Sequence, residues 1–150
     1  QYASRLTSLT FMVQKEVAWR LTATSGGKDY GAITVAVGYF SEPKICMNVG
    51  AHCFIPRPNV DSAVVQLSVY ENPPFALTDR DYFFRVVRAA FCQRRKMLPN
   101  ALANAPYLGV TREQVTGVLE AMGLSGTVRG EVLSPEQFGD LSNRLFAQKA

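Results

Sequence analysis

Two prolines one residue apart, Pro56 and Pro58, constrain this chain more than any other feature of its sequence. Each proline holds its own φ near about −65° and disfavours the α region for the preceding residue, so Ile55 and Arg57 are predicted to be extended. Phe54 therefore begins a stiff, extended loop, and its aromatic ring cannot easily retreat into a core. From residue types alone, a surface aromatic packed over a proline-rich connection is the simplest interpretation.

Length and hydrophobicity limit the class of protein. The chain has 150 residues, 47% of them hydrophobic, which is enough for one core or two small ones. No apolar run approaches the roughly 18 residues of a membrane span, and the N-terminal residues do not resemble a signal peptide. We therefore expect a soluble, cytoplasmic, globular protein that does not interact with membranes.

The cysteines and the histidine indicate neither a disulfide framework nor a metal site. Cys46, Cys53 and Cys92 are odd in number and are never spaced as Cys-x-x-Cys. His52 is the single histidine of the sequence. No bound metal is expected.

The net charge of +4 is unevenly distributed along the sequence. Residues 1–73 contain six lysines and arginines against five acidic residues, whereas residues 74–150 contain ten against seven. The later segment is therefore the better candidate for a surface that binds a polyanion.

The first part of the chain has α/β character. The apolar, β-prone residues 9–13 pass directly into residues 14–21, where Val17 and Leu21 are spaced as on one face of a helix. A buried strand that continues into a helix is typical of an α/β fold. The following Gly26 is interpreted as part of a plain turn rather than a phosphate-binding loop, because no phosphate-binding motif surrounds it.

Residues 30–40 fit two patterns. Their apolar residues alternate as in a strand but also fit one face of a helix, and β-propensity favours the strand. Strands are predicted more firmly for residues 43–49 and 62–69, with a turn at residues 50–52. These two strands would form an antiparallel pair around the Phe54 loop.

The second part of the chain is predicted to be helical. Residues 71–78, which have paired prolines and no periodicity, form the predicted linker. The predicted helices cover residues 81–98, 111–122 and 134–147. Thr78 is the expected N-cap of the first helix, residues 134–137 have the order of a capped helix start, and Gly123 ends the middle helix.

The middle helix has a clear apolar face. Val115, Val118 and Leu119 are spaced to face inward from residues 111–122.

The helix predicted over residues 81–98 carries the main charge argument. At ~100° per residue, four basic residues lie on one stripe of this helix. They are Arg85, Arg88, Arg95 and Lys96. Such a row suits RNA phosphates, because guanidinium groups bind phosphate oxygens bidentately and release counterions. A solvated helix face is the alternative interpretation.

Arg94 differs from its basic neighbours. It falls within the apolar stripe of the same predicted helix, between Phe91 and Leu98. We therefore expect its guanidinium to be buried and paired, and its removal to cost more stability than removal of the other four.

Five blocks of this sequence, in order and at similar spacing, resemble the KsgA-type rRNA adenine dimethyltransferases. They are residues 11–21, 28–31, 54–65, 90–96 and 131–138. The resemblance implies an α/β fold in which residues 1–73 form the C-terminal part of a Rossmann-like class I methyltransferase sheet. Residues 74–150 would be a small all-α domain that binds rRNA. It also implies that residues 30–40 are helical, against their strand propensity.

The resemblance also implies a reaction. Enzymes of this family transfer methyl groups from S-adenosylmethionine to N6 of two adjacent adenosines near the 3′ end of small-subunit rRNA. Phe54 would stack on the extruded target adenine, and the four basic residues would bind RNA. The implied partners are small-subunit rRNA and the pre-ribosomal small subunit. No general base is evident, and Glu16, His52 and Asp61 are interpreted as structural.

Several family motifs do not occur in this sequence. The Gly-rich loop and the acidic residue that hold S-adenosylmethionine are not present, nor is the Asn-Leu-Pro-Tyr motif that grips the adenine. We therefore expect a fragment of a longer enzyme, without cofactor-binding residues of its own. A sheet cut in this way should self-associate.

Two other functions remain open. A non-catalytic RNA-binding or ribosome-assembly module would need the basic helix and no cofactor loop. A relative of the macrolide-resistance rRNA methylases, or of the mitochondrial transcription factors of the same superfamily, would share the fold. Residues 28–31 and 94–96 favour the KsgA branch.

Overall fold

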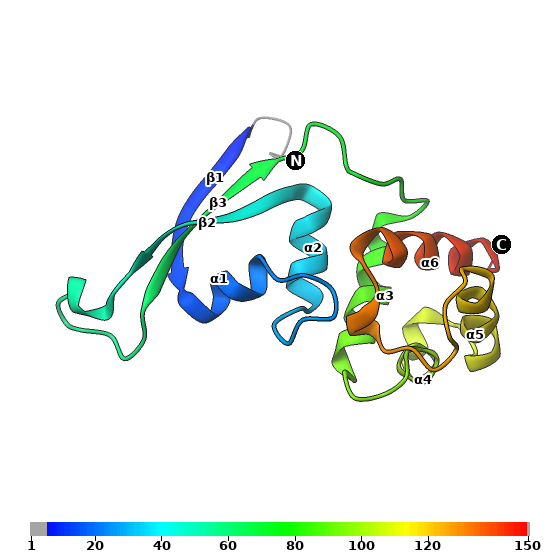
Figure 1. Cartoon of the computed structure of the whole chain (residues 1–150). Coiled ribbons are helices and arrows are strands. Elements are labelled where there is room, and N and C mark those ends of the chain that lie inside the picture. The colour runs from blue at the N-terminus through cyan, green and yellow to red at the C-terminus, as the bar shows by residue number, and fades with distance from the viewer. Residues whose placement is uncertain (1–5, 150) are drawn as a thin grey trace. The chain divides into compact units, whose positions relative to one another are not determined.

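The chain divides into two units (Figure 1). The computed structural model describes residues 6–149. The first unit contains the residues up to Thr24 and Lys28–Pro74, and the second contains Ser25–Gly27 and the residues from Phe75 onward. Within residues 6–149, no helix is long and apolar enough to cross a membrane.

The first unit is built on a three-stranded sheet. Its strands are β1 (Ser8–Gln14), β2 (Ser41–Val49) and β3 (Ser62–Val69). The order is β1-β3-β2, and β3 is antiparallel to both neighbours, so β1 and β2 run in the same direction (Figure 1). The predicted antiparallel pairing of the two strands that flank the Phe54 loop is thereby confirmed.

Two helices cover one face of this sheet. They are α1 (Lys15–Leu21) and α2 (Ala32–Phe40). Alternation along the strands sends every second side chain toward these helices, as in Phe11 and Val65, which are register partners. The core of the first unit is centred on Ala18, Leu21, Ala63 and Val65. The expected passage from a strand into a helix at the start of the chain is confirmed, but the strand is not buried as expected, because every residue of β1 is exposed or half-buried.

Residues 32–40 of the ambiguous segment are helical, as the family resemblance implies and against their local strand propensity. Thr34 accounts for part of this outcome, because its buried Oγ1 accepts a hydrogen bond from the Gly31 N–H (3.1 Å) and donates one to the Arg20 carbonyl (2.6 Å). Val35 and Tyr39, four residues apart, are both buried. Packing against α1 and the sheet therefore outweighs the strand propensity of these β-branched and aromatic residues.

The second unit is helical. Its helices are α3 (Arg80–Cys92), α4 (Leu98–Ala103), α5 (Arg112–Ala121) and α6 (Pro135–Ala147). The largest fully buried side chains of this unit are aromatic residues and leucines from all four helices, including Phe83, Leu102, Leu119 and Phe138. Short 3-10 turns occur at Ala51–Cys53 in the first unit and at Pro106–Leu108 and Gly130–Val132 in the second.

The ends of α5 and α6 follow the predicted capping chemistry. Ser134 Oγ accepts from the Gln137 N–H (3.3 Å), and the Gln137 side chain accepts from the Ser134 N–H (2.9 Å). Thr111 and Gln114, for which no cap was predicted from the sequence, form the same reciprocal pair at the start of α5. Gly123 follows α5 with φ +74°, a conformation that favours glycine. The three residues predicted to face inward from α5 are buried.

The prediction of one helix over residues 81–98 is wrong. Helix α3 ends at Cys92, and a turn follows in which the Lys96 N–H donates to the Gln93 carbonyl (2.8 Å). The Leu98 N–H donates to the Val128 carbonyl (2.7 Å) instead of continuing a helical ladder. Pro99 explains the break, because its ring would clash with the carbonyl four residues earlier in a continuous helix but fits the first turn of α4.

The predicted N-cap of the first helix of this unit is displaced by one residue. Asp79, not Thr78, caps α3: its Oδ1 accepts a hydrogen bond from the Tyr82 N–H at 2.6 Å. The backbone N–H of Thr78 instead donates to Asn143 Oδ1 on α6 (2.8 Å). That contact lies 65 residues away in sequence, so local pattern alone could not reveal it.

Replacement of the observed cap should destabilise the chain. Asp79→Ala removes the acceptor for the Tyr82 N–H and should lower the free energy of unfolding by about 1 kcal/mol. Thr78→Ala is the matched control, since its backbone contact with Asn143 is kept. Urea denaturation of both variants would measure the difference. An equal loss for Thr78→Ala would contradict the assignment of the cap.

We expect the chain to self-associate through the outer edge of β1. Among residues 6–149, β1 pairs only with β3, and Leu9 and Met12 are exposed beside its other edge. Such an edge is a template for a strand of another molecule. Light scattering should therefore detect species larger than a monomer. Hydrogen exchange should find the first unit less protected than the helical one, whose contacts are local. A monodisperse monomer with best-protected β1 amides would contradict this prediction.

Candidate functional site

The Phe54 loop, residues 50–61, connects β2 to β3 at the end of the sheet where β1 passes into α1 (Figure 1). It begins with the turn Ala51–Cys53, after which Phe54 is extended (φ −118°, ψ 147°) and its N–H donates to the Ala51 carbonyl (3.3 Å). The Ile55–Pro56 peptide bond is cis. The ring of Phe54 is half-buried, whereas Ile55 is fully exposed. The loop therefore presents Phe54 from a defined backbone at the sheet end.

Asp61 anchors the end of this loop. Its Oδ1 accepts a hydrogen bond from the Ala51 N–H (2.9 Å), and its carbonyl accepts one from the Lys15 N–H (3.0 Å). These two contacts join the loop to its own start and to the start of α1. Asp61 therefore has a structural role, as its sequence position indicated.

Glu16 and His52 also make structural contacts. Glu16 forms an ion pair with Arg20 one turn further along α1. The ring of His52 fills the space beside Gly50, where an added Cβ would lie 2.5 Å from the ring. These contacts do not place Glu16 or His52 as a general base beside Phe54.

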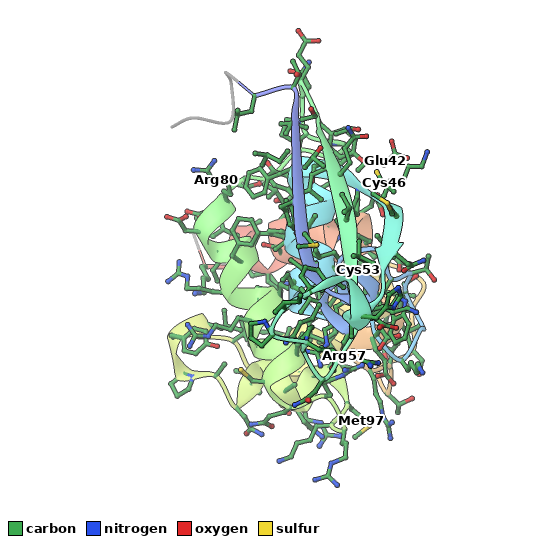
Figure 2. All side chains as sticks on the ribbon, turned by 90° about the vertical axis from the view of Figure 1, so that its left-hand side faces the viewer. Glu42, Cys46, Cys53, Arg57, Arg80 and Met97 are labelled. Atoms are coloured by element: carbon green, nitrogen blue, oxygen red, sulfur yellow. The ribbon has the colours of Figure 1, made fainter. Side chains whose placement is uncertain are left out.

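Arg57 is an exposed cation on the Phe54 loop that the sequence argument used only for its backbone. In Figure 2, Glu42, Cys46, Cys53 and Arg57 follow one another from β2 into this loop. The position of Arg57, three residues after a candidate stacking aromatic, is a sequence signal for an RNA-backbone contact, because every base is attached to a phosphate that a nearby cation can bind.

The four predicted RNA-binding residues are exposed, but they do not share one helix face. Arg85 and Arg88 lie on the outer side of α3, whereas Arg95 and Lys96 belong to the turn between α3 and α4. The Arg85 guanidinium lies 5.6 Å from the centre of the Tyr82 ring. Burial raises the pKa of Tyr82, and Arg85 opposes part of this rise.

The turn between α3 and α4 forms a basic surface cavity. Residues 91–96 line this cavity, which has a volume of about 450 Å³. Phe91 contributes an aromatic wall and its ring contacts that of Phe138 (centroids 5.7 Å apart), while Arg94, Arg95 and Lys96 contribute charge. Three consecutive cations around a hollow can meet neighbouring phosphates of one strand.

The expectation of a buried Arg94 is wrong. Arg94 does form an ion pair, with Glu131 at 3.5 Å, but the two side chains are 43% and 32% exposed. Pairs of this exposure contribute little to stability, typically below about 1 kcal/mol. The end of α3 at Cys92 removes Arg94 from the apolar stripe, so loss of its side chain should not stand out in stability.

Protein groups occupy the ends of β1 and β2 and the turn at Gly26. The strand ends continue at once into α1 and into the turn Ala51–Cys53, the space at Gly50 is filled by His52, and the Gly26 N–H is used by the Glu131 carbonyl (2.7 Å). This use of its N–H supports the interpretation of Gly26 as a plain turn. No group of three His, Cys, Asp or Glu residues within residues 6–149 could hold a metal ion.

The fold places the chain in a class of protein. A dimethyladenosine transferase from Plasmodium falciparum has a similar structure, with a TM-score of 0.75 and 26% identity over 91% of this chain and 56% of that one. The 23S rRNA methyltransferase ErmE is similar in fold, with a TM-score of 0.63 and 24% identity over 93% of this chain and 55% of that one. The first unit is thus part of a Rossmann-like class I methyltransferase fold.

The sequence comparisons then identify the family. The family model described as ribosomal RNA adenine dimethylase matches residues 1–145, and the chain belongs to that family. Two relatives named ribosomal RNA small subunit methyltransferase A are similar to it. The one from Geobacillus thermodenitrificans is 47% identical over 92% of this chain, and the one from Lachnoclostridium phytofermentans is 43% identical over 91%. The chain spans about half the length of these relatives, 47% of each.

The role of Asp61 can be tested by two substitutions, one that removes its acceptor oxygen and one that keeps an acceptor but removes the charge. Asp61→Ala leaves the Ala51 N–H without its acceptor, and Ala51 is buried, so the free energy of unfolding should fall by roughly 1 to 3 kcal/mol. Asp61→Asn keeps an acceptor oxygen and should cost much less. Thermal and urea unfolding would compare them. Equal losses would show that the charge, not the hydrogen bond, holds the loop.

Proposed function

We propose that this chain is a fragment of an rRNA adenine dimethyltransferase acting on the small ribosomal subunit. The complete enzyme would transfer methyl groups from S-adenosylmethionine to N6 of two adjacent adenosines near the 3′ end of small-subunit rRNA. The observation that carries this proposal is the family match over residues 1–145, within which the Phe54 loop stands at the sheet end. Its partners would be small-subunit rRNA and the pre-ribosomal small subunit in the cytoplasm.

Phe54 is the proposed contact with the target base. An enzyme that modifies a base amino group must take the base out of its stack and hold it in a pocket. A half-buried ring on a loop anchored by Asp61 offers a stacking surface at a defined position. Base stacking on an aromatic side chain contributes roughly 1 to 3 kcal/mol. The ring would orient the adenine and would move no proton.

The cofactor would be held by residues outside this chain. S-adenosylmethionine supplies an electrophilic methyl group when bound, and the family's cofactor motifs do not occur in this sequence. We therefore expect no cofactor binding and no methylation by the chain alone. What this chain contributes to the reaction is the orientation of the base and the binding of the RNA strand.

The basic residues of the second unit are the proposed RNA-backbone contacts. Arg95 and Lys96 line the cavity between α3 and α4, and Arg85 and Arg88 extend the positive surface along α3. Exposed cations release counterions when they neutralise phosphates, so they position the RNA without reading its sequence.

One alternative function is supported by the same surface. A non-catalytic RNA-binding or assembly module would use the basic cavity and need no cofactor site. A macrolide-resistance-type methylase is the less favoured alternative, because ErmE is the more distant of the two solved structures. Methylation by the complete enzyme distinguishes the alternatives: small-subunit rRNA as substrate supports the proposal, and large-subunit rRNA or no substrate opposes it.

Replacement of Phe54 should separate catalysis from binding. In the complete enzyme, Phe54→Ala should reduce methylation of assembled small subunits at least tenfold, while their affinity changes little, because the ring acts on the flipped base and not on the backbone. Ile55→Ala, at the exposed neighbour, is the control and should change neither. Parallel loss of binding and methylation by Phe54→Ala would indicate a folding role instead.

Replacement of the basic residues should change the salt dependence of RNA binding. Arg95→Ala and Lys96→Ala should each weaken binding and reduce the slope of log K against log salt by roughly 0.7 to 0.9, as expected for one lost phosphate contact. Arg112→Ala removes an exposed arginine at the start of α5 and serves as the control. Filter binding across a salt series gives the slopes. Unchanged slopes for both variants would contradict phosphate binding by this turn.

A further inference from the structure

A groove of about 680 Å³ lies beside the Phe54 loop in the first unit. One wall is formed by Lys15 and Trp19 of α1 with Lys28 and Asp29 of the following segment. The other wall is formed by residues 59–61, the end of the Phe54 loop itself. The groove and the proposed target-base loop are therefore continuous.

Trp19 is the unusual residue of this groove. It is the single tryptophan of the sequence, and its side chain is 45% exposed, whereas Ala18 and Leu21 of the same helix are buried in the core. The core of the first unit is thus formed without the indole. A large aromatic surface left in contact with water beside a binding loop is an available stacking surface for a base.

The charged groups around Trp19 suit a nucleotide. The Lys15 ammonium lies over the indole ring, 5.5 Å from its centre, where it can pair with a phosphate of a nucleotide bound in the groove. Two of the carboxylates in the groove are already engaged, since Glu16 pairs with Arg20 and Asp61 accepts the Ala51 N–H. Asp29 also lines the groove, and a carboxylate can accept a hydrogen bond from the amino group of a base.

We propose that Trp19 stacks on an unpaired nucleotide that flanks the target adenosine in the substrate RNA. This inference rests on the proposed function, because the flanking strand must pass the Phe54 loop to deliver its base. The groove directly follows that loop, so the nucleotide next to the flipped one meets the groove first. Stacking on a rigid helix would fix the strand and thereby the register of the target base. Trp19 is thus a positioning residue, not a catalytic one.

The single tryptophan makes a direct test possible with the chain itself. The probe is a labelled RNA hairpin with two adjacent unpaired adenosines in its loop, and the reference is the same hairpin with abasic sites in that loop. Anisotropy reports binding, and Trp19 emission reports stacking. We expect saturable quenching of Trp19 by the adenosine hairpin and little quenching by the abasic one, although both bind through their phosphates.

Substitutions give a second readout. Trp19→Leu should weaken binding of the adenosine hairpin at least about fivefold and leave the abasic hairpin unaffected, whereas Trp19→Tyr should retain most of the affinity. Tyr107→Leu, at an exposed aromatic of the second unit, is the matched control and should change neither. Circular dichroism melting of each variant checks the fold, which the exposed position of Trp19 should preserve.

The outcomes separate this inference from the proposed function. One outcome is that Arg95→Ala and Lys96→Ala reduce the salt dependence of hairpin binding, while the hairpin leaves Trp19 emission unchanged and binds Trp19→Leu as tightly as the unaltered chain. In that case the stacking role is wrong and the proposed RNA binding stands. If the chain binds neither hairpin, both are wrong. Equal quenching by the adenosine and abasic hairpins would also overturn the stacking role.

Discussion

The pairing of β3 with both β1 and β2 is the constraint on which the first unit depends. Because β3 is antiparallel to each neighbour, it holds β1 and β2 in the same direction and brings the ends of both strands to one side. The loop that follows β2 and the helix that follows β1 therefore meet at one end of the sheet. Asp61, just before β3, joins them through its two backbone hydrogen bonds. The Phe54 loop and the Trp19 groove are consequences of this arrangement.

The two candidate RNA surfaces follow a common physical scheme. In each, a side chain that solvent reaches stands on a short irregular segment whose backbone is tied to regular structure. Phe54 depends on the anchored loop between β2 and β3, and Arg95 depends on the turn closed by the hydrogen bond from Lys96 to Gln93. A rigid backbone lowers the entropy lost when such a side chain binds, so more of the contact energy appears as affinity.

The expectations that succeeded concern local physical chemistry. The capping pair at Ser134 needs only residues three apart, and the strands around the Phe54 loop follow from alternation and from the prolines between them. The expectations that failed concern where helices begin and end and which groups the side chains there contact. Asp79 displaced Thr78 as a cap because Thr78 is held by Asn143 on a distant helix, and Arg94 left the apolar stripe because α3 stops before Pro99. Such competition between nearby candidates is settled by contacts remote in sequence.

By itself, the sequence determined the strands around the Phe54 loop, the cap at Ser134, the family resemblance and the identity of Phe54 as a candidate, because these depend on residues close together or on ordered motifs. The tertiary structure decided between the strand that local propensity favours at residues 32–40 and the helix that the family resemblance implies, since Val35 and Tyr39 gain more from burial than their β-propensity costs. It also decided that Trp19 stands beside the Phe54 loop. The pairing of β1 with β3 brings residue 19, which follows β1, close to residue 59, which precedes β3. Residue spacing along the chain does not reveal a strand pairing between segments so far apart in sequence.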